Sequence, residues 1–195
     1  MNRSLRIAVA DDEADMRDYF STILPHLGHE VVAAAKTGLE LVESCRITKP
    51  DLVITDIKMP DMDGIDAAAR LYKDAAVPVI LVSAHHDTTT VRRADGDYVM
   101  AYLVKPIKQA DLEPAIAVAI RRFDQFQALQ KEAADLKQAL EDRKVIEKAK
   151  GLLMKKASLD EHDAFRRLQK LASDKNKKLI EIARMLVMAE EAYGG

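Results

Sequence analysis

Five residues with side chains suited to phosphoryl or metal chemistry stand at the ends of apolar runs in the sequence. Asp11 and Asp12 follow the first run and Asp56 the third, while Ser83 and Lys105 end the fourth and fifth. Three carboxylates that lie close together repel one another unless they are protonated or bound to a cation. Such a cluster of oxygen ligands suits Mg²⁺, which keeps several waters and favours a phosphate partner. With an ammonium and a hydroxyl added, the set predicts a site for a phosphoryl group carried on an aspartate.

Each of these residues, taken singly, also fits an ordinary structural role. The aspartate pair could cap a helix, Ser83 could belong to a turn, and Lys105-Pro106 could be part of a loop. The phosphoryl interpretation is favoured because all five residues stand at the ends of successive predicted strands.

The elements that must position these residues are short strands that alternate with helices. Apolar runs typical of strands, several of them buried on both faces, occupy residues 5–10, 31–35, 52–55, 77–83 and 98–104. Helical periodicity occupies residues 14–27, 39–48 and 65–73, with a weaker pattern at 88–94. This alternation predicts a doubly wound α/β fold with five parallel strands. Right-handed crossovers then bring the strand ends that carry the five residues to one carboxyl edge of the sheet.

The motifs at these strand ends resemble the receiver domain of response regulators. They are Asp11-Asp12, residues 56–60 with Asp63-Gly64, Ser83-Ala84 and Lys105-Pro106, and the resemblance covers about residues 5–121. It implies a flavodoxin-like sheet and an aspartate that a histidine kinase phosphorylates. It also implies that the domain catalyses only its own phosphorylation and dephosphorylation, so that the protein is not an enzyme in the usual sense.

The resemblance assigns a role to each carboxylate of the cluster. Asp56 would be the phosphoacceptor and would also bind Mg²⁺. Asp12 would be a direct Mg²⁺ ligand, Asp11 would act through water, and the backbone carbonyl of Lys58 would complete the metal's shell.

The same resemblance assigns the phosphoryl contacts and a switch. Ser83 and Lys105 would hold the phosphoryl oxygens, and Tyr102 matches an aromatic residue that turns inward on phosphorylation. Alternatively, Tyr102 is a strand residue that lies permanently on the surface. Lys58 and His85 occupy flanking positions at which the family varies and tunes the lifetime of the phosphoryl group.

A long helix follows Pro106 and carries a seam of apolar residues at steps of three and four. It should run from about residue 108 to beyond 143, and the seam consists of Phe126, Leu129, Ala133, Leu136 and Leu140. This spacing is that of the a and d positions of a coiled coil. We therefore expect a parallel homodimer, although a single helix that packs on its own domain would show the same pattern.

The last third of the chain contains three helical stripes that should pack on one another. Their apolar residues are Val145, Ile146, Ala149, Leu152 and Leu153; Ala164, Phe165, Leu168, Leu171 and Ala172; and Leu179, Ile182, Ala183 and Leu186. Ser158 and Glu161 have the spacing of a capping box for the second helix. Asn176 is a plausible N-cap for the third.

The charge of the chain reverses in this last part. The net charge of −2 divides into −7 for residues 1–142 and +5 for residues 143–195. A basic tail suggests a polyanionic partner, although a solvated helix surface would show the same charge. Eight basic residues could neutralise phosphates: Lys148, Lys150, Lys155, Arg166, Arg167, Lys170, Lys177 and Lys178.

The tail also resembles the ANTAR domain of regulators that bind nascent RNA and prevent transcription termination. The matching residues are 143–154, 163–168, Ala172, Asn176, Leu179 and Ile182-Ala183, within about residues 136–190. Gln169 departs from the arginine that is more common in the family at this position. The resemblance implies a dimeric antiterminator that binds stem-loop RNA, whereas the alternative is a signalling module whose helical output binds a protein or DNA.

The sequence therefore divides into three predicted parts. Residues 1–121 form the receiver, 122–143 a coiled-coil linker helix, and 144–195 a small all-α domain of three helices. No apolar stretch approaches the roughly 20 residues that span a bilayer, so we expect no membrane contact. The single cysteine, Cys45, fits the reducing environment of the cytoplasm.

Overall fold

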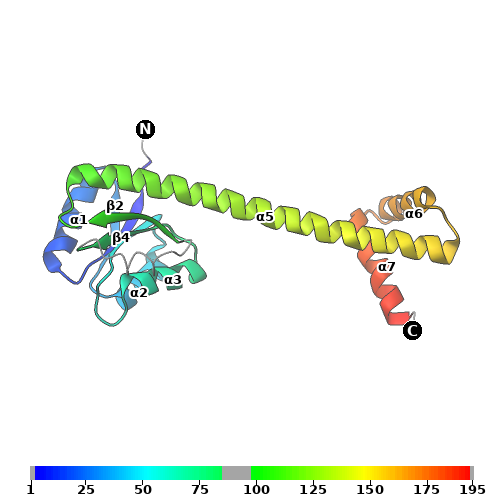
Figure 1. Ribbon diagram of the computed structural model, residues 1–195, viewed down its shortest axis with the longest axis horizontal. Helices are drawn as coiled ribbons and strands as arrows, with labels where there is room; N and C mark the ends of the chain where they lie inside the picture. The colour runs from blue at the N-terminus through cyan, green and yellow to red at the C-terminus, as the bar shows by residue number, and fades with distance from the viewer. Residues whose placement is uncertain (1–2, 85–97, 194–195) are drawn as a thin grey trace. The chain divides into compact units, whose positions relative to one another are not determined.

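A computed structural model describes residues 3–84 and 98–193 of the chain, which form two compact units, Met1–Gln127 and Ala128–Gly195. The first unit is built on a five-stranded parallel sheet with the strand order β2-β1-β3-β4-β5. Figure 1 shows this sheet among its helices. The strands are β1 Arg6–Ala10, β2 Glu30–Ala35, β3 Leu52–Asp56, β4 Val79–Ser83 and β5 Val99–Val104. The predicted doubly wound fold is confirmed, with strand ends within two residues of those expected.

Helices cover both faces of this sheet. They are α1 Ala14–His26, α2 Gly38–Thr48 and α3 Gly64–Asp74, followed by the long helix α5 Gln109–Ala157. Side chains cap the N-termini of α2 and α3. Thr37 Oγ1 accepts a hydrogen bond from the Glu40 N–H at 3.2 Å, and Asp63 Oδ1 accepts one from the Asp66 N–H at 2.8 Å. The predicted helix at residues 88–94 lies outside the described residues.

Each face of the sheet has its own hydrophobic core. On one face, buried side chains such as Leu41 of α2 and Ala68 of α3 pack against the strands. On the other, Phe20 of α1 and Leu112 of α5 are fully buried. The central strands are buried on both sides, which explains why their sequences are continuous apolar runs.

Helix α5 is a single continuous helix of 49 residues. Its first turns pack on the sheet through Leu112, Ile116 and Ala119. Every residue from Ala128 to Leu140 is exposed, including the apolar seam positions within that range. The long helix is thus confirmed and fits a coiled coil. It continues without a break through residues 143 and 144, so the first stripe of the last domain is the end of the same helix.

The second unit is completed by α6 Glu161–Asp174 and α7 Leu179–Tyr193. A core of predicted stripe residues joins these helices to the end of α5: Ala149, Leu168, Ala172, Ile182 and Ala183, together with Val187. Alanine at three of these positions, 149, 172 and 183, allows close approach between helices. None of the helices in the described ranges 3–84 and 98–193 is both long and apolar enough to cross a membrane.

The structure corrects both predicted N-caps of this unit. Asp160, not Ser158, caps α6, since its Oδ1 accepts the Asp163 N–H at 2.7 Å. Ser158 lies outside the helix with a φ of 52°. A capping side chain must directly precede the first helical residue, and α6 begins at Glu161.

Asn176 ends α6 instead of beginning α7. Its φ of 49° is left-handed, and its N–H donates to Ser173 O at 3.0 Å. The N–H of Lys177 donates to Ala172 O at 2.9 Å, which completes a Schellman motif. At the start of α7, the Lys178 N–H donates to the Glu181 carboxylate at 2.8 Å. Asparagine suits both a left-handed C-terminal position and an N-cap, so its type alone did not decide between them.

Candidate functional site

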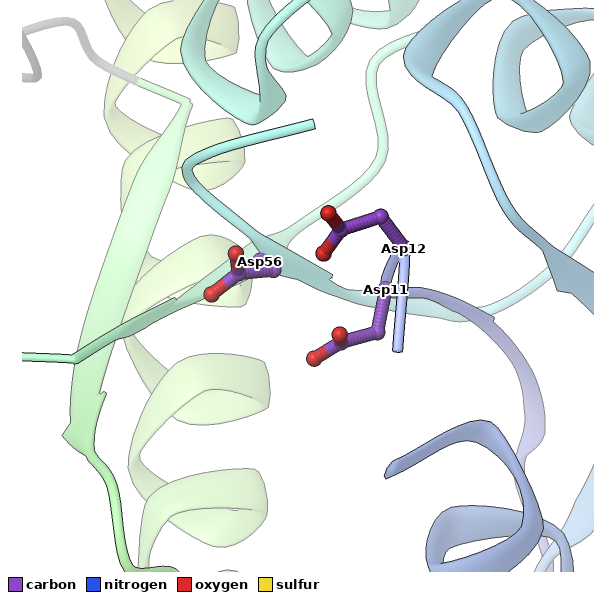
Figure 2. Close-up of side chains that lie close together, drawn as sticks. All are labelled: Asp11, Asp12 and Asp56. Atoms are coloured by element: carbon purple, nitrogen blue, oxygen red, sulfur yellow. The ribbon is translucent and has the colours of Figure 1, made fainter. Parts of the chain in front are cut away.

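The three predicted metal-binding carboxylates meet at the carboxyl edge of the sheet. Asp11 and Asp12 follow β1, and Asp56 ends the neighbouring strand β3, which is paired in register so that Ala10 faces Thr55. One carboxylate oxygen from each residue lies within 4.8 Å of the others (Figure 2). Asp11 and Asp56 are buried, whereas Asp12 is exposed. The cluster therefore has two buried carboxylates and one that faces solvent.

A close approach of Gly64 helps to fix the position of Asp56. The Gly64 N–H donates to Ile57 O at 2.9 Å, and a Cβ at position 64 would lie 2.0 Å from the Asp56 carbonyl oxygen. Only glycine fits there. The Lys58 N–H also donates to Asp56 Oδ2 at 3.2 Å, which orients the carboxylate.

The buried carboxylate of Asp11 is incompletely satisfied by protein atoms. Its Oδ1 accepts the Glu13 N–H at 3.0 Å. Its Oδ2 accepts no hydrogen bond of good geometry from any residue that the structure describes, although Lys105 Nζ lies 3.0 Å away as an ion-pair partner. A buried oxygen of this kind, beside two further carboxylates, fits a hard divalent cation such as Mg²⁺.

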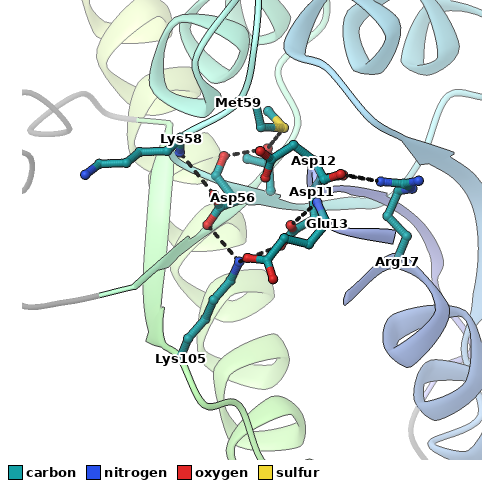
Figure 3. Close-up of polar contacts among 9 residues, drawn as sticks. Asp11, Asp12, Glu13, Arg17, Asp56, Lys58, Met59 and Lys105 are labelled. Atoms are coloured by element: carbon teal, nitrogen blue, oxygen red, sulfur yellow. Dashed lines mark hydrogen bonds and ion pairs between the residues drawn. The ribbon is translucent and has the colours of Figure 1, made fainter. Parts of the chain in front are cut away.

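Lys105, which directly follows β5, brings one positive charge close to the carboxylates of Asp11, Glu13 and Asp56. Its Nζ lies 3.0 Å from Asp11 Oδ2, 3.1 Å from Glu13 Oε1 and 3.5 Å from Asp56 Oδ1 (Figure 3). Burial by itself lowers the pKa of Lys105, but its pairing with Asp11 and Glu13 and the charge of Asp56 raise that pKa above the ordinary value. The lysine is therefore cationic in this site.

Asp56 is held in a setting that opposes its ionisation. Burial raises the pKa of Asp56, the charge of Lys105 lowers it, and the charge of Asp11 raises it again, so that the pKa lies above its ordinary value. A cation bound between the carboxylates would favour the ionised form, which is the form that can act as a nucleophile.

The structure places three of the other predicted receiver residues, Ser83, Lys58 and Tyr102. Ser83 ends β4, and its carbonyl accepts the Lys105 N–H at 2.9 Å, which ties the two strand ends together. The side chain of Lys58 extends away from the carboxylates, so its backbone is the part that borders them (Figure 3). Tyr102 is 38% exposed on β5. His85 lies outside the described residues.

Two residues of the site were missed by sequence reasoning. Glu13 contacts Lys105, as given above. The Arg17 guanidinium donates to the carbonyls of Asp11 and Asp12 at 2.8 and 3.0 Å and so holds the loop after β1 (Figure 3). Glu13 could have been predicted to belong to the site, because it is a charged residue directly after the aspartate pair. Arg17 could not, because the position of its side chain depends on how the first turn of α1 packs.

The structure divides the eight predicted basic contacts of the second unit into engaged and available side chains. Lys148 pairs with Glu191 at 2.6 Å, and Arg166 donates to His162 Nδ1 at 3.2 Å. Five further basic side chains are exposed, and none of them forms an ion pair or side-chain hydrogen bond within the part of the chain that the structure describes. They are Lys155, Arg167, Lys170, Lys177 and Lys178.

Lys150 differs from all the others because its side chain is only 9% exposed. Its Nζ lies 2.9 Å from Glu147 Oε2 and 2.8 Å from Glu161 Oε1, and it lies 5.9 Å from the centre of the Phe165 ring. The hydrogen bonds to Glu161 and Glu147 raise the pKa of Lys150. This ammonium joins α5 to α6 and is not presented to solvent as a phosphate contact would be.

Comparisons with known proteins match both units. The family model of the response regulator receiver domain matches residues 7–117, and that of the ANTAR domain matches residues 134–187. A curated relative, the transcriptional regulatory protein PdtaR of Mycobacterium tuberculosis, is 41% identical over 182 residues, which cover 93% of this chain and 89% of that protein. The DNA-binding response regulator MtrA of Mycobacterium leprae is 30% identical over 131 residues, 67% of this chain and 58% of that protein.

Solved structures resemble the first unit. A response regulator receiver domain from Clostridium thermocellum has a TM-score of 0.56 at 31% identity and covers 62% of this chain and 97% of its own. The receiver domain of the response regulator NarL from Mycobacterium tuberculosis has a TM-score of 0.58 at 26% identity, over 62% of this chain and 98% of its own.

Proposed function

Because this chain belongs to the response regulators that join a receiver domain to an ANTAR domain, we propose that it is a phosphorylation-controlled transcription antiterminator that binds stem-loop RNA. A histidine kinase supplies the phosphoryl group, Asp56 receives it, and the protein works in the cytoplasm as a dimer formed along α5. The observation that supports phosphorylation of Asp56 is the position of Lys105 Nζ, which lies 3.0 Å from Asp11 Oδ2 and 3.5 Å from Asp56 Oδ1.

The residues of the receiver support a direct transfer to Asp56. An oxygen of its carboxylate attacks phosphorus, the bond from phosphorus to the donor breaks, and the donor leaves with the electron pair. Lys105 and the Ser83 hydroxyl stabilise the charge on the phosphoryl oxygens. Asp11, Asp12, Asp56 and the Lys58 carbonyl would hold Mg²⁺, which neutralises charge on the carboxylates and the phosphoryl group.

The second half of the proposal rests on the basic surface of the second unit. Its exposed, available side chains lie near the end of α5, on α6 and directly before α7, while the apolar stripes pack between the helices. Such side chains can neutralise RNA phosphates without a cost to the core. The 30% identical DNA-binding relative matches 131 residues of this chain, whereas PdtaR matches 182, so the relatives favour the ANTAR type of output.

Labelling with a radioactive small-molecule phosphodonor tests the receiver. We expect wild-type protein to be labelled only with Mg²⁺ present, and Asp56→Asn to be unlabelled because its amide is not a nucleophile. Asp15→Asn is the matched control, since Asp15 is exposed on α1 outside the cluster. Undiminished labelling of the Asp56→Asn protein would assign the phosphoryl group to another residue.

RNA binding tests the output. The RNA probe is chosen from transcripts that crosslink to the protein in cells, with and without a phosphodonor. This RNA is then titrated with the wild type and with a triple variant in which Arg167, Lys170 and Lys178 are changed to alanine. We expect weaker binding, and a slope of log affinity against log salt that is shallower by roughly 0.7–0.9 per lost contact. The control removes three exposed receiver lysines, Lys36, Lys73 and Lys108, and should bind like the wild type. Preference for duplex DNA, or no RNA binding even when phosphorylated, would favour the DNA or protein partner.

A further inference from the structure

Glu13 places an exposed carboxylate beside the carboxylate cluster, in contact with the Lys105 ammonium. Its side chain is 65% exposed, whereas that of Lys105, which it contacts, is 17% exposed. The Glu13 N–H donates to Asp11 Oδ1 at 3.0 Å, so the backbone of this residue is fixed beside the carboxylate cluster. Figure 3 shows the Glu13 carboxylate beside the end of the Lys105 side chain. The receiver motifs assign no role to this position.

The Lys105 ammonium is closer to Glu13 than to the phosphoacceptor. Its Nζ lies 3.1 Å from Glu13 Oε1 and 3.5 Å from Asp56 Oδ1. Hydrogen bonds from an ammonium to a carboxylate oxygen are usually shorter than about 3.2 Å, so Glu13 is within this range and Asp56 is beyond it. With Asp11 at 3.0 Å on the other side, the resting lysine is shared between two carboxylates that do not receive the phosphoryl group.

From this geometry we infer that Glu13 is a positioning residue that competes with the phosphoryl group for the Lys105 ammonium and so restrains phosphorylation of Asp56. The inference rests on the proposed function of the receiver. When the Asp56 oxygen forms its bond to phosphorus and the leaving group departs with the electron pair, negative charge remains on the phosphoryl oxygens. Lys105 stabilises that charge only after its contact with Glu13 is released.

The size of the effect follows from the exposure of the pair. Ion pairs that are open to solvent on one side contribute little, because water and salt screen them. Release of one such contact should therefore change the rate of phosphorylation by about two- to fivefold. Glu13→Gln is the sharpest variant, since it keeps the size of the side chain and removes its charge.

The test measures phosphorylation of the full chain by acetyl phosphate at saturating Mg²⁺. We expect Glu13→Gln to be phosphorylated about two- to fivefold faster than wild type. Asp15→Asn removes the same charge two residues further along, at an exposed position outside the cluster, and should behave like wild type. Equal acceleration in both variants would mean that general charge, and not the contact with Lys105, sets the rate, and it would overturn the inference.

The same substitution in a protein that lacks Lys105 tests whether the effect of Glu13 acts through this lysine. In a Lys105→Met protein there is no ammonium to release, so adding Glu13→Gln should leave the slow residual phosphorylation unchanged. An equal acceleration in the two backgrounds would contradict competition for Lys105. Beryllofluoride, which binds an aspartate as a stable phosphoryl mimic, gives an equilibrium readout: Glu13→Gln should bind it more tightly with Lys105 present, and unchanged affinity would count against the inference.

Failure of this inference is distinguishable from failure of the proposed function. If wild-type protein is labelled on Asp56 and Glu13→Gln behaves identically in the rate and beryllofluoride measurements, only the role of Glu13 is rejected. If wild-type protein takes up no phosphoryl group, or if Asp56→Asn is still labelled, the proposed function itself is wrong and Glu13 has no phosphoryl group to compete with.

Discussion

The Lys105 ammonium lies 3.0 Å from Asp11 Oδ2, closer than the 3.5 Å that separates it from Asp56 Oδ1. Asp11 is fully buried and Lys105 is largely buried, so this ion pair is screened less than one at the surface. The lysine therefore partly neutralises the carboxylate cluster in the absence of a cation. A divalent cation would have to share the site with this ammonium, which makes the contribution of each carboxylate to metal binding measurable.

Asp12 is the carboxylate of the cluster whose removal should weaken Mg²⁺ binding with least disturbance of the fold. It is exposed, whereas Asp11 and Asp56 are buried. Asp12→Asn would remove a carboxylate ligand of the proposed cation site, and we expect calorimetry to show at least about tenfold weaker binding. Asp15→Asn should bind Mg²⁺ like wild type. Equal affinity in Asp12→Asn and wild type would place the ion elsewhere.

The apolar seam of α5 predicts a dimer that charge can disrupt. Leu136 and Leu140 are 59% and 60% exposed in the single chain. Changing both to lysine would place like charges across the seam of a coiled coil, and sedimentation should then show the mass of a monomer. Lysines at Ala134 and Gln138, which lie off the seam, are the control and should leave the mass unchanged. A dimer that survives the leucine changes would have to form through another surface.

Lys150 should stabilise the second unit instead of binding RNA directly. Lys150→Met removes its contacts to Glu147, Glu161 and the Phe165 ring, whereas the two exposed carboxylates stay solvated, so the loss should be modest. We expect circular dichroism to show a melting temperature lower by several degrees. Lys155→Met, at an exposed position on the same helix, should melt like wild type. A variant that melts normally but loses RNA affinity would instead identify Lys150 as a phosphate contact.

His29 should make stability depend on pH below its ordinary pKa of 6.5. Burial lowers the pKa of His29 in the folded protein, although Glu113 opposes the shift, and Nδ1 accepts the Leu5 N–H at 3.3 Å. Because the unfolded chain then binds the proton more readily, the free energy of unfolding should fall as pH falls through 6.5. Asn at this position keeps an acceptor and does not titrate.

Urea denaturation across this pH range checks the prediction. The difference in stability between wild type and His29→Asn should decrease steadily as pH falls below 6.5. A difference that is constant with pH would show that His29 titrates alike in the folded and unfolded states.

Cys45 should be unreactive in the folded protein. Its side chain is buried in the core under α2, and burial raises the pKa of the thiol to about 12. Since only the thiolate is alkylated, iodoacetamide at about pH 8 should label the native protein very slowly and the urea-unfolded protein completely. Rapid labelling under native conditions would mean that this part of the core opens frequently.

Much of the fold was predictable because its signals are local. Strands buried on both faces must be continuous apolar runs, and this placed β3 and β4 to within two residues. The stripes of the last three helical segments were equally visible, since each helix buries one face. The helix caps near Ser158 and Asn176 were predicted wrongly because serine, aspartate and asparagine suit several positions around a helix end, and the packing of α6 and α7 selects among them.

The sequence by itself determined which residues could do chemistry: strand ends that carry Asp11, Asp12, Asp56 and Lys105 must meet once parallel strands pair. Only the tertiary structure decided how charges are shared among them. A contact between Glu13 and Lys105 joins residues 92 positions apart. The buried Lys150 joins α5 to α6, although Lys148 and Lys155 on the same helix are exposed. Both depend on distances between side chains from different elements, which a pattern along one chain does not contain.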